Sequence, residues 1–490
     1  MAVILFFTAT GFILYYPVLG NTFLSDDYDS LYRIYIEKRI LYREFFRPMI
    51  DISFYFNYLV SGTSPGSFYI FNLVVHIINA LLLFRFTQRI GMAGKKDQFL
   101  FGAVSAFLFL IYPFHNESIS WLSGRLSSMA CLFALLSMVL SREKSGGLFI
   151  FLSIVCYLIG LLCYESIIVL PLIIIVLNRH QYKSAREIIS YSLYWVCTAG
   201  IYLLTRLLLS GEITGSYASH VTDSNVKEKV LNTGKVLGRL FLPPSGNQAL
   251  LTGLTVVLFI LLIAIHRYLF KNKIIANIAR FNYLSVLTCL AISLLVPVAF
   301  GVSTRTSEGD RLLYFPSCFL CILAAGSILA LYKKPLNRWL VLTVITFYCT
   351  WFLELNNLHW VKASGAAQAI MDVIKNKGSR NIIFINMPDE LEGAFVFRNG
   401  FRKALVINQI DTGSVKIFNY LKRPDYLKTG SAIVPVVQDS VTAIFPFTRV
   451  MVKGEHLVHI TSVVNNESLT VEKEGNLIYY WNKEQLVRLF

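Results

Sequence analysis

The chain has 490 residues, of which 55% are hydrophobic and only 15% are charged. Soluble domains carry about 25% charged residues, so this composition excludes an ordinary soluble protein and indicates a polytopic membrane protein. The net charge of +16 comes from lysines and arginines in short loops between apolar runs. Such loops are typical of membrane topology signals. Because no basic stripe carries interleaved aromatic residues, we expect no nucleic-acid partner.

Apolar runs of about 20 residues, the length that crosses a bilayer, recur over the first three quarters of the chain. We predict about eleven spans, near 2–20, 67–88, 98–113, 119–141, 147–163, 165–178, 187–209, 249–267, 281–300, 312–332 and 336–354. Two of them, 147–163 and 165–178, are short enough to form a re-entrant pair instead. The first run lacks a basic start and a small-residue cleavage motif, so we expect a retained membrane anchor.

The basic loops predict how the chain is oriented. Five loops rich in Lys and Arg fall on one side when the spans are counted: 85–98, 142–146, 178–186, 266–280 and 332–338. The positive-inside rule makes that side the cytoplasm. We therefore expect a cytoplasmic N-terminus and an extracytoplasmic C-terminal region, with a bacterial inner membrane and a periplasmic tail as the setting. The long loop 21–66 is extracytoplasmic but basic, which suits an anionic lipid substrate.

The last quarter of the chain changes character, which predicts a transmembrane module over 1–355 and a soluble extracytoplasmic domain over 356–490. Within the soluble domain, residues 360–377 read as a helix and Asn381–Asn386 as a buried strand. Further strands are expected at 395–397, 432–437, 443–447, 468–471 and 477–481, with a hairpin turn at 472–476 between the last two. These elements predict a small α/β or α+β domain.

Two adjacent carboxylates, Asp26 and Asp27, directly follow the first span, on the side expected to be extracytoplasmic. Carboxylates at a membrane surface are costly unless they are hydrated, paired or used. Such a pair can take a proton from an acceptor hydroxyl or hold a metal ion. The alternative is a solvated cap on the next helix, because Asp favours N-cap positions.

Other polar side chains are predicted at the same surface, at the ends of different helices. They are His115 and Glu117 in the loop 114–118, Arg125 just inside the fourth span, Glu165 at the start of the sixth, and Arg311 and Tyr314 at the start of the tenth. An arginine within a span is costly, so we expect Arg125 to pair with a carboxylate or a phosphate. Cations on a phosphate and a carboxylate base on an acceptor together suit an anionic lipid-phosphate ligand.

A polar face also runs along the second span, where Asn72, His76 and Asn79 share one side of the helix. Interhelical hydrogen bonding is common in membrane bundles and is the competing interpretation of this face. The chain has no Walker loop and no G-x-G-x-x-G motif, so no soluble nucleotide site is evident.

These stretches resemble the GT-C glycosyltransferases, polytopic enzymes that use polyprenyl- or dolichyl-phosphate sugars. In particular they resemble the membrane module of the transmembrane O-mannosyltransferases that carry tetratricopeptide repeats, and the bacterial relatives of that module. The matching stretches are Phe23–Asp27, Phe46–Pro48, the helix with Asn72, His76 and Asn79, His115–Glu117 with Trp121 and Gly124–Arg125, Tyr164–Glu165, and Asp310–Ser317.

The resemblance implies an inverting hexosyltransferase that moves a sugar to a protein, glycan or lipid hydroxyl outside the cytoplasm. The family's first-loop acid falls on Asp26, with Asp27 beside it, and a second-loop acid falls on Glu117. Lipid-phosphate contacts are implied for basic residues, for which we choose Arg125 and Arg311. Expected substrate-binding residues also include Arg47, His76, His115, Glu165 and Tyr314.

The cofactor and the acceptor are less determined. A divalent cation, Mg²⁺ or Mn²⁺, is open as a cofactor, with Asp26 and Glu117 as candidate ligands. A shared site would need those two carboxyl groups within about 12 Å of each other. No tetratricopeptide repeats follow the membrane module, so the resemblance supports the donor chemistry better than the acceptor.

Two other functions remain as alternatives. A lipid-linked glycan transporter or flippase usually shows paired inverted repeats with Gly- or Pro-broken spans, and no such pairing is visible in this chain. A non-catalytic cell-envelope scaffold, whose tail binds wall components, would keep its role without Asp26.

Overall fold

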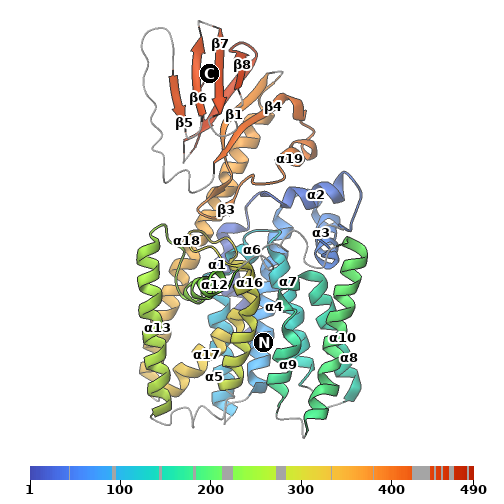
Figure 1. Ribbon diagram of the computed structural model, residues 1–490, viewed down its shortest axis with the longest axis vertical. Helices are drawn as coiled ribbons and strands as arrows, with labels where there is room; N and C mark the ends of the chain where they lie inside the picture. Colours follow the sequence, from blue (N-terminus) through green and yellow to red (C-terminus); the bar gives the residue numbers. More distant parts are fainter. Residues whose placement is uncertain are drawn as a thin grey trace. The chain divides into compact units, whose positions relative to one another are not determined.

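A computed structural model describes residues 1–42, 45–90, 95–142, 146–179, 184–211, 225–271, 283–332, 334–378, 380–421, 442–445, 448–453, 456–462, 468–482 and 485–489. The chain forms two compact units (Figure 1). The first, which we call the helical unit, comprises residues 1–19, 40–62 and 67–357. The second, the mixed unit, comprises residues 20–39, 63–66 and 358–490.

The helical unit is built almost entirely of α-helices. They are α1 (Ala2–Tyr15), α3 (Pro48–Ser61), α4 (Gly66–Ile90), α5 (Lys95–Leu110), α6 (Asn116–Ile119), α7 (Arg125–Leu140), α8 (Gly146–Cys163), α9 (Leu170–Asn178), α10 (Ala185–Ser210), α12 (Val226–Arg239), α13 (Gln248–Lys271), α15 (Tyr283–Ser293), α16 (Leu295–Phe300), α17 (Tyr314–Leu331) and α18 (Pro335–Lys375), which continues into the mixed unit. Short 3₁₀ turns η1 (Tyr16–Val18), η2 (Glu165–Ile167) and η5 (Asp310–Leu313) precede or join helices.

Membrane-spanning character is clear for much of this unit. Among the described residues, six helices are long and apolar enough to cross a membrane, at 66–90, 186–210, 248–265, 283–300, 310–331 and 335–375. Shorter apolar helices lie at 2–18, 98–110, 125–140, 147–163 and 165–178. The apolar window is 83% buried in the span at 310–331 but only 6% buried in α13. The span at 310–331 therefore lies inside the bundle, whereas α13 offers apolar surface to lipid.

Two predicted spans differ from the structure: a proline divides one of them, and the other continues without a break into the next predicted helix. The span expected at 281–300 is divided into α15 and α16 at Leu294. Pro297 has no N–H for the carbonyl of Ser293, so the regular hydrogen-bond ladder stops there. The span expected at 336–354 and the helix expected at 360–377 are instead one continuous 41-residue helix, α18. The sequence between them has no helix-breaking residue.

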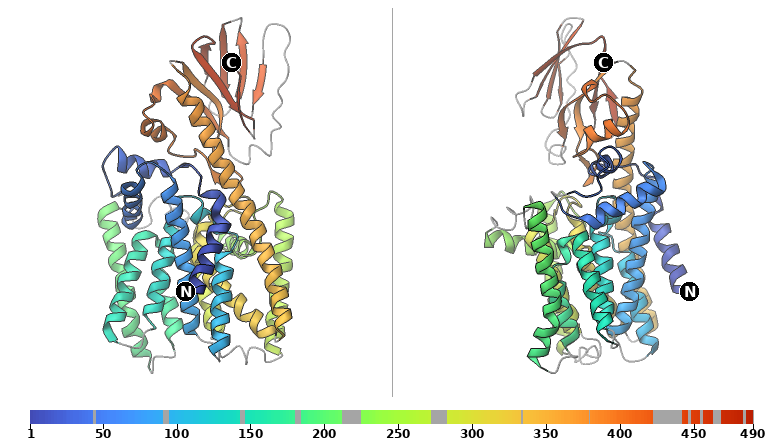
Figure 2. Two further views of the ribbon diagram at one scale, coloured as in Figure 1. Left: turned by 180° about the vertical axis from the view of Figure 1, so that it is seen from behind. Right: turned by 90° about the vertical axis from the view of Figure 1, so that its right-hand side faces the viewer.

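Different elements lie at the two ends of the helical unit. The helix ends that flank the five predicted basic loops gather at one end, and α3, α6 and α16 lie at the other (Figure 1). Helix α12 was not predicted, and it lies across the direction of the long helices (Figure 2). Its start is fixed by Asn225, whose side chain accepts a hydrogen bond of 3.0 Å from the backbone N–H of Glu228, as an N-cap residue does.

The mixed unit joins part of the predicted first loop to the tail. It contains α2 (Asp27–Tyr35), α19 (Phe401–Ile407), the 3₁₀ turn η6 (Thr412–Ser414), and the strands β1 (Asn381–Pro388), β2 (Glu390–Leu391), β3 (Ala394–Phe395), β4 (Val415–Leu421), β5 (Thr442–Phe445), β6 (Thr448–Lys453), β7 (Leu457–Ser462), β8 (Ser468–Glu472), β9 (Asn476–Trp481) and β10 (Leu486–Arg488). The predicted strand at 432–437 lies outside the described residues, and of the predicted strand at 395–397 only Phe395 lies in a strand, at the end of β3.

Two four-stranded sheets form the core of the mixed unit. The first is a mixed sheet in the order β10-β9-β1-β4, in which β1 is parallel to both β4 and β9. The second is antiparallel, in the order β5-β6-β7-β8. One apolar cluster draws Ile383, Phe418 and Ile478 from the first sheet and Val450 and Val458 from the second, so the sheets pack face to face. The predicted buried strand at Asn381–Asn386 is confirmed as β1.

The hairpin predicted at 472–476 is wrong. Strand β8 pairs with β7 in the antiparallel sheet, whereas β9 pairs with β1 and β10 in the mixed sheet. The turn itself forms, with Gly475 at a φ of +84°, but it carries the chain from one sheet to the other. Leu477 and Ile478 are buried, and a central position beside β1 provides that burial, which an exposed two-stranded hairpin would not.

Candidate functional site

A polar cavity of about 400 Å³ opens in the helical unit. It is lined by Tyr164, Glu165, Ser166, Asn232, Lys235, Val296, Phe300, Gly301, Val302, Ser303, Glu308, Gly309, Arg311 and Leu312. These residues come from η2, from α12, from the end of α16 with the loop after it, and from η5. The cavity therefore brings together segments far apart in the sequence and combines charged side chains with apolar walls.

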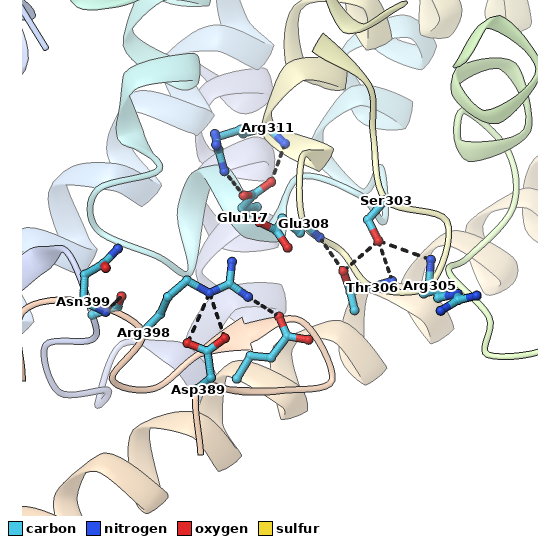
Figure 3. A network of polar contacts seen from close by, with 11 residues as sticks. Glu117, Ser303, Arg305, Thr306, Glu308, Arg311, Asp389, Arg398 and Asn399 are labelled. Atoms are coloured by element: carbon cyan, nitrogen blue, oxygen red, sulfur yellow. Dashed lines mark hydrogen bonds and ion pairs between the residues drawn. The ribbon is translucent and has the colours of Figure 1, made fainter. Parts of the chain in front are cut away.

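Arg311 is held at the cavity by Glu117 (Figure 3). Its guanidinium pairs with one carboxylate oxygen of Glu117, and its backbone N–H donates to the other at 2.8 Å. The side chain of Glu117 is 1% exposed and that of Arg311 is 19% exposed. Burial raises the pKa of Glu117, and attraction by Arg311 opposes that rise. Glu117 does not line the cavity, so its direct effect is to orient a cation that does.

Glycine at position 124 lets the loop with Glu117 close against α7. A Cβ at this position would collide with the carbonyl oxygen of Glu117. The Trp121–Gly124–Arg125 pattern therefore has a packing reason beside its resemblance to a family. Trp121 also lies under the Arg311 guanidinium, 5.6 Å from the centre of its ring system.

Glu165 lines the cavity between two arginines. Arg47 lies 3.2 Å from its carboxylate and Arg206 lies 3.4 Å from it. Arg47 also lies over the ring of Tyr164, at 4.8 Å. The structure thus brings together the predicted residues Arg47 and Glu165, and it adds Arg206 from near the C-terminal end of α10. An arginine inside an apolar span is itself a functional signal, and it could have identified Arg206 from the sequence.

Lys235 and Asn232 were not singled out by sequence reasoning, because no element was predicted between the spans at 187–209 and 249–267. Both project from α12 into the cavity lining. Within the described residues Lys235 is exposed and has no ion-pair partner. The signal that was missed is the helix start at Asn225, followed three residues later by Glu228.

Arg125 is fully buried away from the cavity lining. Its guanidinium donates to the side chain of Asn57 at 2.7 Å and to the carbonyl of Phe68 at 3.2 Å, and it lies 4.3 Å from the ring of Phe54. These contacts join α7 to α3 and α4. The donors of Arg125 are thus used inside the bundle, so we do not assign it a role in the function proposed below.

The polar face of α4 forms interhelical hydrogen bonds. His76 shares a hydrogen bond of 2.7 Å with the hydroxyl of Tyr314, and Asn79 donates to the carbonyl of Ser128 at 2.8 Å. His115 shares a hydrogen bond of 2.8 Å with Ser317, and burial lowers the pKa of His115. His76, His115 and Tyr314 are all buried, and none lines the cavity. This is the packing interpretation that the sequence left open.

Asp26 and Asp27 belong to the mixed unit and have different surroundings. Asp27 is fully buried, and its carboxylate accepts a hydrogen bond of 3.0 Å from the backbone N–H of Leu24. Asp26 is partly exposed at the N-cap position of α2, where its side chain makes no capping hydrogen bond. Its carboxylate instead accepts a hydrogen bond of 2.8 Å from the side-chain amide of Asn399. Asp26 is therefore the carboxylate of the pair that a substrate can reach.

The carboxylates do not suit a shared divalent cation. Both oxygens of Glu117 are engaged by Arg311, so a cation bound there would have to displace a buried ion pair. Across the described segments, no group of three or more His, Cys, Asp or Glu side chains is arranged to hold a metal ion. We derive no chemical step through a metal.

The fold and the cavity define a class: a multi-pass membrane protein with a charged cavity at one end of its helical unit. The chain belongs to the EpsG family, whose model matches residues 4–361. That match and the similarities described next confirm the family resemblance inferred from the sequence.

Local similarity links the chain to O-mannosyltransferases. It is 30% identical over 100 residues to "Protein O-mannosyl-transferase TMTC1" of Mus musculus, which covers 20% of this chain and 10% of that protein. It is 30% identical over 128 residues to "Protein O-mannosyl-transferase Tmtc1" of Drosophila melanogaster, covering 25% and 14%. For "Protein O-mannosyl-transferase F38B6.6" of Caenorhabditis elegans the identity is 22% over 156 residues, covering 28% and 22%. The chain thus spans at most 22% of the length of these relatives.

Proposed function

We propose that this protein is a GT-C-type glycosyltransferase that moves a sugar from a polyprenyl-phosphate carrier to an extracytoplasmic hydroxyl. The cavity carries the proposal, because it places Arg311 and Lys235 together beside apolar walls. Family membership and the names of the O-mannosyltransferase relatives support a sugar transferase. Among the described residues, six helices are long and apolar enough to cross a membrane and five shorter apolar helices accompany them, which supports a multi-pass membrane enzyme.

The donor phosphate would bind in the cavity. Charge-assisted hydrogen bonds from arginine and lysine are the strongest contacts available to a phosphate. Arg311 is oriented by Glu117 before any ligand arrives, and such preorganisation lowers the ordering cost of binding. Arg47 and Arg206 neutralise Glu165, one of the two carboxylates in the cavity lining beside Glu308, and so reduce the repulsion of a phosphate there. The apolar residues Val296, Phe300 and Leu312 offer contact for the first carbons of a lipid chain.

Asp26 would act as the general base. The acceptor hydroxyl gives its proton to the carboxylate of Asp26, and its oxygen attacks the anomeric carbon of the sugar. The bond between that carbon and the phosphate oxygen breaks, and the phosphate leaves with the electron pair. Arg311 stabilises the charge that develops on the leaving phosphate. Attack from the face opposite the phosphate inverts the anomeric configuration.

A reconstituted transfer assay tests the proposal. Purified protein in liposomes receives polyprenyl phosphates carrying radiolabelled hexoses, together with a cell-envelope extract as the source of acceptors. We expect label to move from the lipid fraction to an acceptor fraction in a protein-dependent reaction. Passage of the intact donor across the bilayer without covalent transfer would overturn the proposal in favour of a flippase, and neither result with any hexose would favour a scaffold.

The proposed orientation can be measured by cysteine labelling. Ser468 is exposed at the start of β8, and no native cysteine lies beyond Cys349. We expect Ser468→Cys to react with a membrane-impermeant maleimide in intact cells. Ser184→Cys, at the exposed N-cap of α10 in a predicted cytoplasmic loop, is the matched control and should react only after lysis. The wild-type chain gives the background, and the reverse pattern would refute the orientation.

A further inference from the structure

Residues 396–399, which precede α19, form hydrogen bonds with the loop that carries Asp26. The backbone N–H of Ser25 donates to the carbonyl of Val396 at 2.9 Å, and the backbone N–H of Asn399 donates to the hydroxyl of Ser25 at 3.2 Å. The side-chain amide of Asn399 then donates to the Asp26 carboxylate at 2.8 Å. Residues about 370 apart in sequence thus hold both the backbone before Asp26 and its carboxylate.

The backbone at this contact is unusual on both sides. Ser25 has a φ of +46°, a left-handed conformation that is uncommon for residues other than glycine. Gly400 has a φ of +75°, and a Cβ on it would collide with the carbonyl oxygen of Ser25. Non-glycine residues in such conformations persist where surrounding contacts over-determine them, and they cluster at functional sites.

The segment 396–399 is itself held by the two residues that directly follow strand β1, Asp389 and Glu390, the second of which begins β2. The guanidinium of Arg398 donates to Asp389 at 3.1 Å and to Glu390 at 2.7 Å (Figure 3). Asp389 and Glu390 are buried, and the backbone N–H of Val396 donates to the carbonyl of Asp389 at 3.0 Å. Strand β1 is central in its sheet and buried except at Asn381, and such a strand is a rigid support. The residues after β1 therefore fix Arg398, the neighbouring Asn399 is fixed with it, and Asn399 in turn holds the carboxylate of Asp26.

We infer that Asn399 is a positioning residue for the catalytic base, and that residues 396–399 of the mixed unit hold the Asp26 carboxylate in its reactive orientation. The inference rests on the proposed function, in which Asp26 removes the acceptor proton. A hydrogen bond to one carboxylate oxygen restricts the rotation of the group and so fixes the direction from which the carboxylate can accept a proton.

The decisive variant is Asn399→Ala, assayed for transfer with separate kcat and donor KM. We expect kcat to fall roughly tenfold, the usual effect of losing a hydrogen bond to a charged group, while the donor KM is unchanged. Asn399→Asp should be worse than Asn399→Ala, because it places a second carboxylate against Asp26. Asn399→Gln keeps the amide and should recover part of the loss.

A matched control separates positioning from anchoring. Lys403 lies on α19 and pairs with Asp29 of α2 at 2.8 Å, so Lys403→Ala removes a neighbouring contact between the same two segments without touching Asp26. We expect it to retain transfer within about twofold, since exposed ion pairs contribute little. Both variants should melt at the wild-type temperature, because Asn399 and Lys403 lie at the surface.

A double-mutant cycle makes the inference falsifiable. If Asn399 acts through Asp26, adding Asn399→Ala to Asp26→Asn should lower the residual transfer no further. An equal loss in both backgrounds, or no loss in either, would overturn the positioning role while leaving Asp26 as the base. Full transfer by Asp26→Asn alone would overturn the proposed function and this inference with it.

Discussion

Asp26→Asn should lower transfer by about 10²-fold or more, the usual contribution of a general base, while donor binding changes little. The substitution removes the proton acceptor but nearly preserves the shape of the side chain. Asp26 is partly exposed and is held by Asn399 at 2.8 Å, so the fold should tolerate the change. The measurement is transfer of radiolabelled sugar from a polyprenyl-phosphate donor, with donor binding measured separately.

Asp29→Asn is the matched control for that experiment. Asp29 lies on the same helix, three residues after Asp26, and pairs with the surface residue Lys403. Its loss should change transfer by no more than about twofold. Wild-type transfer by Asp26→Asn would leave the transporter or the scaffold as the better account. Equal losses from the two substitutions would point to a general electrostatic effect of α2 rather than to a base.

Arg311→Ala should weaken donor binding by about 10- to 100-fold, because hydrogen bonds to charged groups contribute roughly 1.5–3 kcal/mol and each 1.4 kcal/mol is about tenfold in affinity. Arg311 lines the cavity, and its guanidinium is oriented by Glu117. Titration of purified protein with a fluorescent polyprenyl phosphate measures the dissociation constant.

Loss of Arg311 also leaves Glu117 buried without its partner, which is costly for the fold. Arg311→Ala combined with Glu117→Gln removes both charges and should restore stability without restoring binding. Arg305→Ala, in the loop before η5 and outside the cavity lining, should bind donor normally. Recovery of wild-type affinity in the double variant would show that Arg311 supports the fold and does not contact phosphate.

The length of the apolar runs predicted several helices of the helical unit closely, because each run carries its own signal. Helices α4 (Gly66–Ile90) and α10 (Ala185–Ser210) begin and end within two residues of the predicted limits. Helix α12 contributes Lys235 to the cavity, but it is short and charged. It therefore gives no apolar-run signal, and the sequence analysis missed it. The strand partners of β8 and β9 depend on which sheet can bury each strand, and the turn between them contains no information about that choice.

The candidate site shows the same limit. The sequence indicated Glu117, Glu165 and Arg311 as separate residues at the ends of predicted spans, and the family resemblance added Arg47 from the predicted loop 21–66. Which carboxylate pairs with which arginine was not predictable, because the Arg311–Glu117 pair joins residues 194 positions apart. Charged residues with the same sequence signal also have different environments, since Arg125 is enclosed by aromatic rings and amides whereas Arg311 reaches the cavity.

In the proposed mechanism the cavity holds one donor lipid, and the acceptor hydroxyl attacks its sugar with Asp26 as the general base. An experimental structure of the protein with a bound, non-hydrolysable polyprenyl-phosphate sugar analogue tests it most directly. We expect the phosphate within about 3–4 Å of the Arg311 guanidinium and the Asp26 carboxylate on the face of the sugar opposite the phosphate. A phosphate bound outside this cavity, or an Asp26 carboxylate more than about 10 Å from the anomeric carbon, would contradict the account.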